Sequence, residues 1–287
     1  MIRSRDVVDR SSCFVPEFLT PLFYTSIYRD LNEEQRLCYN QLHGCYCNEQ
    51  IMFLERCLAE PALRSLSDRL PGPLRGSLRT FLAEEKRHSR LFRRLNRRCF
   101  PELYRRRDFH FLALSPGWHR VVRAAARRPF FFSLVIWLML LEEERAVAIG
   151  LEYLRGKDRL EPNFVALHRL HVGDEIGHVH WDQQILDVLW PQIPAWSRRL
   201  NAILLRWIVD EFLITPKRSN WRVVRELAVR FPELRFRLPE IRRALAAVGA
   251  DPAWRDALHS GATIPRTLDR LRAVPEMDPV REALLAR

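Results

Sequence analysis

The chain has 287 residues, of which 47% are hydrophobic and 29% are charged. This balance is typical of a soluble globular protein that can bury a large core, either as one large domain or as a core domain with an appendage. The net charge of +12, carried mostly by arginine, suits acidic partners or a solvated basic face. None of the recognised nucleic-acid-binding signatures is present in the sequence, so no nucleic-acid partner is expected.

The cysteines and the apolar runs exclude two further classes. None of the six cysteines is spaced as Cys-x-x-Cys, and charged residues interrupt the start of the chain, so we predict reduced thiols, no signal peptide and a cytoplasmic location. The strongest apolar run, 129–141, is too short to span a bilayer and is followed at once by three glutamates. It predicts a buried core helix and no membrane span.

The elements follow in chain order from caps and breaks. Residues 1–31 look irregular, and Asn32 with Gln35 forms a capping-box start for the first long helix, which Pro61 should end. Proline and glycine residues mark the ends of the remaining predicted helices. The predicted long helices are 32–58, 73–98, 129–154, 163–190 and 194–214, with a short helix at 118–128.

This layout predicts an all-α, ferritin-like helical bundle with a long crossover and extra C-terminal helices, because two helical hairpins are joined by one long connection. We expect three parts: residues 1–31 as an irregular segment packing on the bundle, 32–215 as the metal-binding bundle, and 216–287 as a helical appendage.

Two of the predicted helices each carry a Glu-x-x-His motif, Glu85 with His88 and Glu175 with His178. Residues three apart lie on one face of a helix, so each pair can converge on one point. A single motif of this kind is weak evidence in a chain rich in glutamate. Two copies, each on the second helix of a hairpin, indicate a shared site.

The fourth long helix carries polar residues where an apolar seam would normally lie. They follow steps of three and four residues: His168, His171, Glu175, His178 and Asp182. Burying such a stripe without partners would cost on the order of several kcal/mol per group. A bound metal is the simplest explanation, with Asp182 either orienting a ligand imidazole by a hydrogen bond or lying at the helix surface.

The first and third helices supply further carboxylates, and the sequence leaves a choice on each. The first offers Glu49 or Glu55, and Glu49 is preferred because apolar neighbours extend its face. The third offers Glu143 or Glu144, which helical periodicity does not separate. Carboxylates combined with imidazoles suit iron or manganese better than a structural zinc site.

This pattern resembles the ligand set of ferritin-like di-iron carboxylate proteins. The additional His171 narrows the resemblance to the p-aminobenzoate N-oxygenase (AurF-like) family, as do the Glu144-Arg145 pair and the opening stretch 14–31. The resemblance covers roughly residues 12–215. It implies no catalytic residue beyond seven ligands to two irons, which are Glu49, Glu85, His88, Glu144, His171, Glu175 and His178.

The resemblance also implies a reaction. A reduced di-iron centre would activate O2 through a peroxo intermediate and oxidise an aromatic amine to a hydroxylamine, nitroso or nitro compound. It implies a homodimer, a small arylamine substrate and an external electron donor, and the arginine stretches 105–107 and 127–128 would suit an acidic redox partner or a solvated face. The alternatives are a di-iron hydroxylase or desaturase of another substrate, or a non-enzymatic ferroxidase or iron-handling protein.

Overall fold

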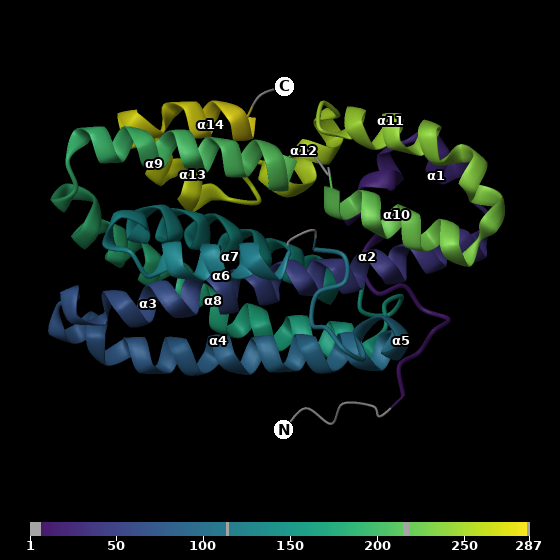
Figure 1. Cartoon of the computed structure of the whole chain (residues 1–287), viewed down its shortest axis with the longest axis horizontal. Coiled ribbons are helices and arrows are strands. Elements are labelled where there is room, and N and C mark those ends of the chain that lie inside the picture. Colours follow the sequence, from purple (N-terminus) through teal and green to yellow (C-terminus); the bar gives the residue numbers. More distant parts are fainter. Residues whose placement is uncertain (1–6, 113–114, 215–217, 286–287) are drawn as a thin grey trace.

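The computed structural model describes residues 7–112, 115–214 and 218–285. Four long helices run side by side along the molecule (Figure 1): α2 (Glu33–Phe53), α4 (Gly72–Cys99), α7 (Phe132–Arg155) and α8 (Pro162–Leu189). Helix α2 packs on α4, and α7 packs along α8. The link between α4 and α7 carries α5 (Pro101–Tyr104) and α6 (Pro116–Ala126), and the described residues form no strand. The predicted all-α bundle with a long crossover is confirmed.

Side-chain caps set where two of these helices begin. The Asn32 side chain accepts a hydrogen bond from the Gln35 backbone N–H at 2.9 Å, and the Gln35 side chain accepts one from the Asn32 N–H at 3.1 Å, so the predicted capping box is present. At the start of α8, the Glu161 carboxylate accepts from the N–H groups of Asn163 and Phe164 at 2.7 and 3.0 Å. These caps satisfy backbone donors that have no partner inside the helix.

The first helix does not end at Pro61 as predicted. The chain passes from α2 into a π-helical segment, η3 (Leu54–Ala59), and then into α3 (Glu60–Leu66). Pro61 lies in the first turn of α3, where a backbone N–H would have no helical partner, so its missing donor costs little. The wider π turn also rotates the residues beyond 53 relative to α2, and these include Glu55.

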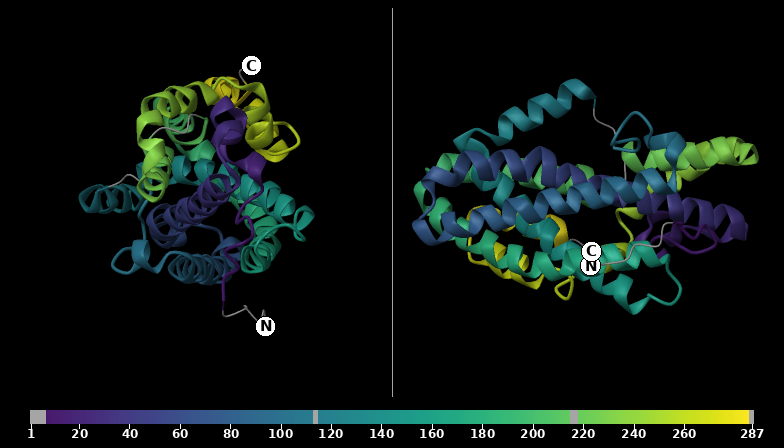
Figure 2. Two further views of the ribbon diagram at one scale, coloured as in Figure 1. Left: turned by 90° about the vertical axis from the view of Figure 1, so that its right-hand side faces the viewer. Right: turned by 90° about the horizontal axis from the view of Figure 1, so that it is seen from below.

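The C-terminal helices cover the bundle. They are α9 (Ala195–Ile208), continued by the π segment η7 (Val209–Ile214), then α10 (Arg218–Arg230), α11 (Leu238–Val248), α12 (Pro252–His259), α13 (Pro265–Arg272) and α14 (Asp278–Leu285). Helices α9 and α13 pack on α7, and α10 packs on α2. The view along the long axis shows these helices, in green to yellow, on one side of the bundle (Figure 2, left).

The buried Asn40 side chain of α2 makes three hydrogen bonds to the segment before that helix. The Asn40 amide accepts from the backbone N–H groups of Phe14 and Val15 at 2.8 and 3.2 Å, and it donates to the Val15 carbonyl at 2.7 Å. The short helix α1 (Ser26–Asp30) follows before α2 begins. These bonds, together with those that Gln41 donates to the Arg10 and Ser12 carbonyls, hold this segment over the bundle.

Helix α7 contains the apolar run from Phe132 onward, and its side chains from Leu134 to Leu141 are all buried, which confirms the predicted core helix. It approaches α8 tightly at Gly150, where an added Cβ would lie 2.1 Å from Cγ2 of Val172. Within the described residues, no helix is by itself long and apolar enough to cross a bilayer; one sharply bent pair, Gly117–Ala126 with Pro129–Arg155, meets that test by length and composition alone.

The buried apolar side chains form two clusters, and the polar motifs lie where one gives way to the other. Along α4, Phe81 belongs to one cluster and Phe92 to the other, with Glu85 and His88 between them. Along α8 the same change occurs across His171, Glu175 and His178. The fold thus encloses a band of ionisable groups between two apolar cores.

Candidate metal centre

Seven buried side chains from four helical segments converge in this band. Within each of two groups, the potential ligand atoms lie within 4.8 Å of one another. The first group comprises Glu55, His88 and His171, and the second comprises Glu85, Glu143, Glu175 and His178. Each bundle helix, counting the π segment as part of the first, contributes at least one side chain, which is the arrangement expected for a ferritin-like centre.

Glu175 connects the two groups. Its Oε1 lies 3.0 Å from Nε2 of His171 and 3.4 Å from Nδ1 of His88, while its Oε2 lies 3.3 Å from Nδ1 of His178. Glu85 occupies a similar position, with its Oε1 3.3 Å from Nδ1 of His178 and 3.9 Å from Nδ1 of His88. The two motif glutamates therefore lie between the groups, where a carboxylate can bridge two metal ions.

The inward-facing atoms fit metal ions because they have no hydrogen-bond partner within the described part of the chain. These buried atoms include Oε1 of Glu55 and Glu175, Nδ1 of His88 and His178, and Oε2 of Glu143. Leaving such groups buried and unpaired costs about 1–3 kcal/mol each. Four carboxylates and three imidazoles offset most of the charge of two divalent ions and suit iron or manganese.

Two carboxylates outside the cluster contact the outer ring nitrogens of His88 and His178. Each carboxylate lies on the helix opposite its histidine. Nε2 of His88, on α4, lies 2.7 Å from Oδ2 of Asp174 on α8, and Nε2 of His178, on α8, lies 3.0 Å from Oε2 of Glu84 on α4. A carboxylate that accepts a hydrogen bond from the outer N–H directs the inner nitrogen toward a metal. Neither of these two residues was identified from the sequence. The available signal was that each motif glutamate follows another acidic residue.

Burial and crowding shift the pKa values of the metal-free cluster. Burial, with the charge of Glu55, raises the pKa of Glu85 to about 7. Burial alone would lower the pKa of His171, but the charge of Glu175 and the contacts with Glu55 and Glu175 raise it to about 10. Burial and the nearby Asp182 raise the pKa of Glu143 well above its ordinary value. The metal-free cluster therefore holds protons that bound cations would displace.

Glu49 does not reach this cluster, contrary to the sequence prediction. Its carboxylate faces the crossover, where it accepts from the Tyr104 hydroxyl at 2.7 Å and from the backbone N–H groups of His110, Phe111 and Leu112 at 2.7 to 3.1 Å. Glu55 takes the position instead, because the π segment turns it toward α4 and α8.

Glu144 is also directed elsewhere. Its two oxygens accept from the backbone N–H groups of Arg266 and Thr267 at 2.8 and 2.7 Å, so it caps the start of α13. Its neighbour Glu143 faces the cluster. Neighbouring helical residues point about 100° apart, so only one of the two can face α8 while the other faces the C-terminal layer.

Two further residues of the α8 seam are buried beside the cluster. Asp182 is fully buried near Glu143 rather than at the helix surface, and its predicted role in orienting an imidazole stays a prediction. His168 is buried and stacks on Tyr153 with ring centroids 3.7 Å apart. Burial and the nearby His171 lower the pKa of His168 well below its ordinary value, so it is neutral.

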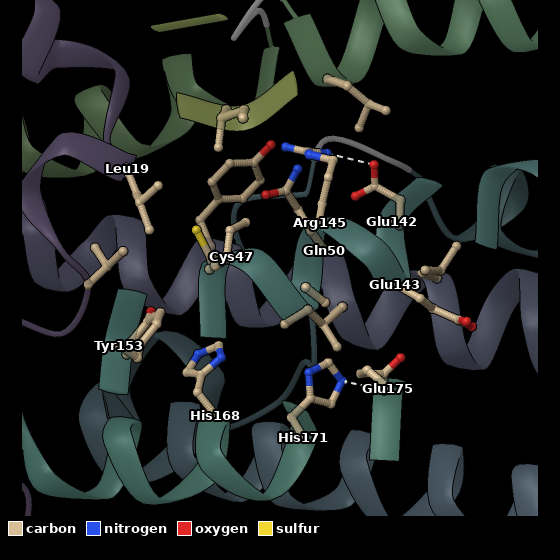
Figure 3. Close-up of a pocket in the computed structure, with 18 of the residues that line it drawn as sticks. Leu19, Cys47, Gln50, Glu142, Glu143, Arg145, Tyr153, His168, His171 and Glu175 are labelled. Carbon is tan, nitrogen blue, oxygen red and sulfur yellow. Dashed lines mark hydrogen bonds and ion pairs between the residues drawn. The ribbon is translucent and has the colours of Figure 1, made fainter. Parts of the chain in front are cut away.

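A cavity of about 110 Å³ adjoins the cluster (Figure 3). His171 and Glu175 lie at one end, and Arg145 and Glu142 lie at the other. Part of the wall comes from the C-terminal helices and η7, through Phe212, Leu213, Asn220, Trp254 and Leu258. The C-terminal layer therefore completes the site.

Fold and cluster together define a ferritin-like helical bundle with a carboxylate- and histidine-lined centre that can hold two metal ions. The family model for p-aminobenzoate N-oxygenase AurF matches residues 4–271. The chain belongs to this family, and it is an enzyme, an oxidoreductase of the N-oxygenase type. None of the curated proteins compared with the chain matches it.

The family match extends well beyond residue 215, where we expected the resemblance to end. The structure supplies the physical reason. Helices α10 and α12 line the cavity, and the start of α13 receives Glu144. The C-terminal helices thus form part of the wall of the site.

Proposed function

We propose that this enzyme is a non-haem di-iron oxygenase that oxidises the nitrogen of a small aromatic amine. The observation that carries the proposal is the convergence of the two Glu-x-x-His motifs with a third histidine and two more carboxylates, their inner atoms buried and unpaired. We assign one iron to Glu55, His88 and His171, and the other to Glu143 and His178. Glu85 and Glu175 would be shared between them.

Two irons held there would supply the electrons that activate O2 once an external donor has reduced them. The chain's own residues prepare the site. Asp174 and Glu84 accept hydrogen bonds from the outer imidazole nitrogens of His88 and His178, which orients both rings with their inner nitrogens toward the metal positions. Ile51, Leu54 and Ile149 give the adjoining cavity apolar walls, which exclude water.

The cavity suits one aromatic ring, because its volume of about 110 Å³ is close to the ~150 Å³ of an apolar cavity that binds benzene. The family description names p-aminobenzoate, and we propose an arylamine of this size as the substrate. In the first oxidation, the amine, O2, two electrons and two protons give the hydroxylamine and water. The electrons require an external reductant.

Metal analysis and turnover test the proposal together. The purified protein should contain about two irons per chain, and the reduced protein should convert arylamines to hydroxylamine, nitroso or nitro products that mass spectrometry identifies. Glu55→Gln should lose iron and activity, while Glu144→Gln, on a carboxylate of similar burial that caps α13, should keep its iron. A single zinc per chain, or iron without oxygen consumption, would contradict the proposal.

Two alternatives share these ligands. A hydroxylase or desaturase would give products changed at carbon, which the same mass spectra would distinguish. A ferroxidase or iron-handling protein would oxidise excess Fe²⁺ without consuming an organic substrate. The substrate-sized cavity beside the cluster favours the oxygenase over this second alternative.

We further propose a cytoplasmic homodimer that receives electrons from an acidic partner. The exposed arginines Arg105, Arg106 and Arg107 lie outside the cavity and suit such a partner. Reduction by an acidic donor should slow as salt is added, and sedimentation should give twice the mass of the chain. Reduction that does not depend on salt would contradict the acidic partner, and a monomer in sedimentation would contradict the homodimer.

A further inference from the structure

Two imidazoles of the cluster are each separated from solvent by a single carboxylate. Nε2 of His88 lies 2.7 Å from Oδ2 of Asp174, and Nε2 of His178 lies 3.0 Å from Oε2 of Glu84. Both carboxylates reach the surface, because the side chain of Asp174 is 20% exposed and that of Glu84 is 28% exposed. They lie where α4 meets α8, so on this face one side chain stands between solvent and the cluster.

Other sides of the cluster are covered by further elements. Helices α9 and α13 pack on α7, and α6 packs on the π segment η3, which carries Glu55. Helix α4 lies on the side of the bundle away from α9 and α14 (Figures 1 and 2). The wall of the cavity includes Phe212 and Trp254 from the C-terminal layer. A substrate in the cavity and a protein on the α4–α8 face would therefore occupy different sides of the cluster.

The exposed surface of α4 beside this boundary is basic. Arg87, Arg90 and Arg94 follow at steps of three and four residues, so they share one face of the helix. Arg87 pairs with Asp174. Arg90 and Arg94 are exposed and form no ion pair with the described residues. Their charges are therefore available to an acidic partner.

Asp174 joins these arginines to the cluster. It contacts Arg87 on one side and His88 on the other, and Nδ1 of His88 lies 3.4 Å from Oε1 of Glu175 inside the cluster. A redox group that approaches Arg87 is thus separated from the cluster by one carboxylate and one imidazole. Electron transfer slows steeply as its path lengthens, so this face offers a short route.

The arginines at 105–107 are exposed as well but have no such connection. They follow α5, beyond the end of α4 at Cys99. Helix α4 rises about 16 Å between His88 and Cys99, so these arginines lie far from the cluster along the bundle. They suit the long-range attraction of an acidic donor rather than the transfer of its electron.

We propose that an acidic electron-transfer protein docks on the α4–α8 face, over Arg87, Arg90 and Arg94, and reduces the metal centre by way of Asp174 and His88. This inference rests on the proposed di-iron function and deepens it, because it assigns a surface to the external donor. Two one-electron carriers are oxidised in turn, and each reduces one Fe³⁺ to Fe²⁺.

Equilibrium binding tests the docking surface without turnover. The probe is an oxidised plant-type [2Fe–2S] ferredoxin, an acidic one-electron carrier, titrated calorimetrically into the purified, metal-loaded full chain at low ionic strength. Arg90→Glu combined with Arg94→Glu should weaken binding by about tenfold or more. Arg105→Glu combined with Arg106→Glu is the matched control, because it makes the same change in net charge at two exposed arginines. This control should weaken binding by less than about twofold.

Anaerobic stopped-flow reduction tests the route. At low salt, reduced ferredoxin should reduce the Arg90→Glu, Arg94→Glu variant about tenfold more slowly than the wild type, and added salt should narrow the difference. Reduced methyl viologen, which needs no docking surface, should reduce this variant no more slowly than the wild type. That result would show that the metal centre itself is intact.

Equal weakening by the two pairs of substitutions would show attraction by net charge alone and would overturn the inference. Failure of ferredoxin to bind the wild type at low salt would overturn it too, as would a dimer in sedimentation that Arg90→Glu with Arg94→Glu dissociates. The proposed function is scored separately. A viologen-reduced protein that leaves arylamines unchanged refutes N-oxygenation alone, whereas viologen-driven N-oxidation with equal ferredoxin rates in both variants refutes the docking surface alone.

Discussion

Replacing Glu49 with glutamine tests whether this carboxylate holds the crossover or a metal ion. In the structure, its two oxygens accept hydrogen bonds from the Tyr104 hydroxyl and from three consecutive backbone N–H groups, those of His110, Phe111 and Leu112. The side chain is fully buried, so water does not replace a lost acceptor. Glu49→Gln keeps the shape and exchanges one acceptor oxygen for an NH2 group.

The expected loss follows from the donors left behind. Either orientation of the amide places its NH2 against one or two N–H or O–H donors, and each unpaired buried donor costs about 1–3 kcal/mol. We expect a loss of about 3 kcal/mol. A chain of 287 residues has an unfolding entropy of about 0.6 kcal/mol/K, so Tm should fall by about 5 °C.

Metal content distinguishes this structural role from ligation. Glu49→Gln should retain about two irons per chain, while Glu55→Gln should lose iron because its carboxylate lies in the cluster with His88 and His171. Thermal unfolding by circular dichroism and iron analysis of both variants complete the comparison. If Glu49→Gln lost iron and Glu55→Gln kept both ions, the register assigned to the first helix would be refuted.

Three further results are expected. Asp174→Asn should lower iron affinity about 10- to 100-fold in chelator competition, because the outer nitrogen of His88 loses its charged acceptor. The gain in Tm on iron loading should widen between pH 5 and 8. In the metal-free protein the pKa of Glu85 is raised from 4.5 to about 7 and that of His171 from 6.5 to about 10. The stability that their bound protons give is complete below the ordinary pKa values, and the metal-free protein loses it as pH rises through the raised ones. Gly150→Ala should destabilise the protein by about 1–3 kcal/mol, because its Cβ would overlap Val172, and Val172→Ala should reduce that penalty.

Each of these has a control or a contrary outcome. Asp187→Asn, at an exposed ion pair on the same helix as Asp174, should leave iron affinity unchanged. A constant gain in Tm with pH would contradict the displacement of protons by metal. In the metal-free protein, Glu85→Gln should reduce the fall of Tm between pH 5 and 8, because it removes one titrating group. Strict additivity of Gly150→Ala and Val172→Ala in denaturant unfolding would show that the two side chains do not meet.

The motif residues on the second helix of each hairpin could be interpreted from the sequence, although their outer partners Glu84 and Asp174 could not. Glu85 with His88, and Glu175 with His178, are fixed relative to each other by the period of one helix. The polar seam on α8 added His171 for the same reason. Local geometry determines which of these residues share a face, and burying such a face requires partners whatever the tertiary arrangement.

The first and third helices could not be interpreted in this way, because their carboxylates depend on what packs around them. The π segment η3 turns Glu55 toward the cluster and leaves Glu49 facing the crossover, and a π segment has no clear sequence signal. Glu143 and Glu144 are both buried, and the choice depends on α13, which lies about 120 residues further along the chain. The sequence by itself determined the bundle, its two motifs and the kind of chemistry they suit. Only the tertiary structure decided which remaining carboxylates join them, because that choice rests on a local change of helical pitch and on contacts between distant segments.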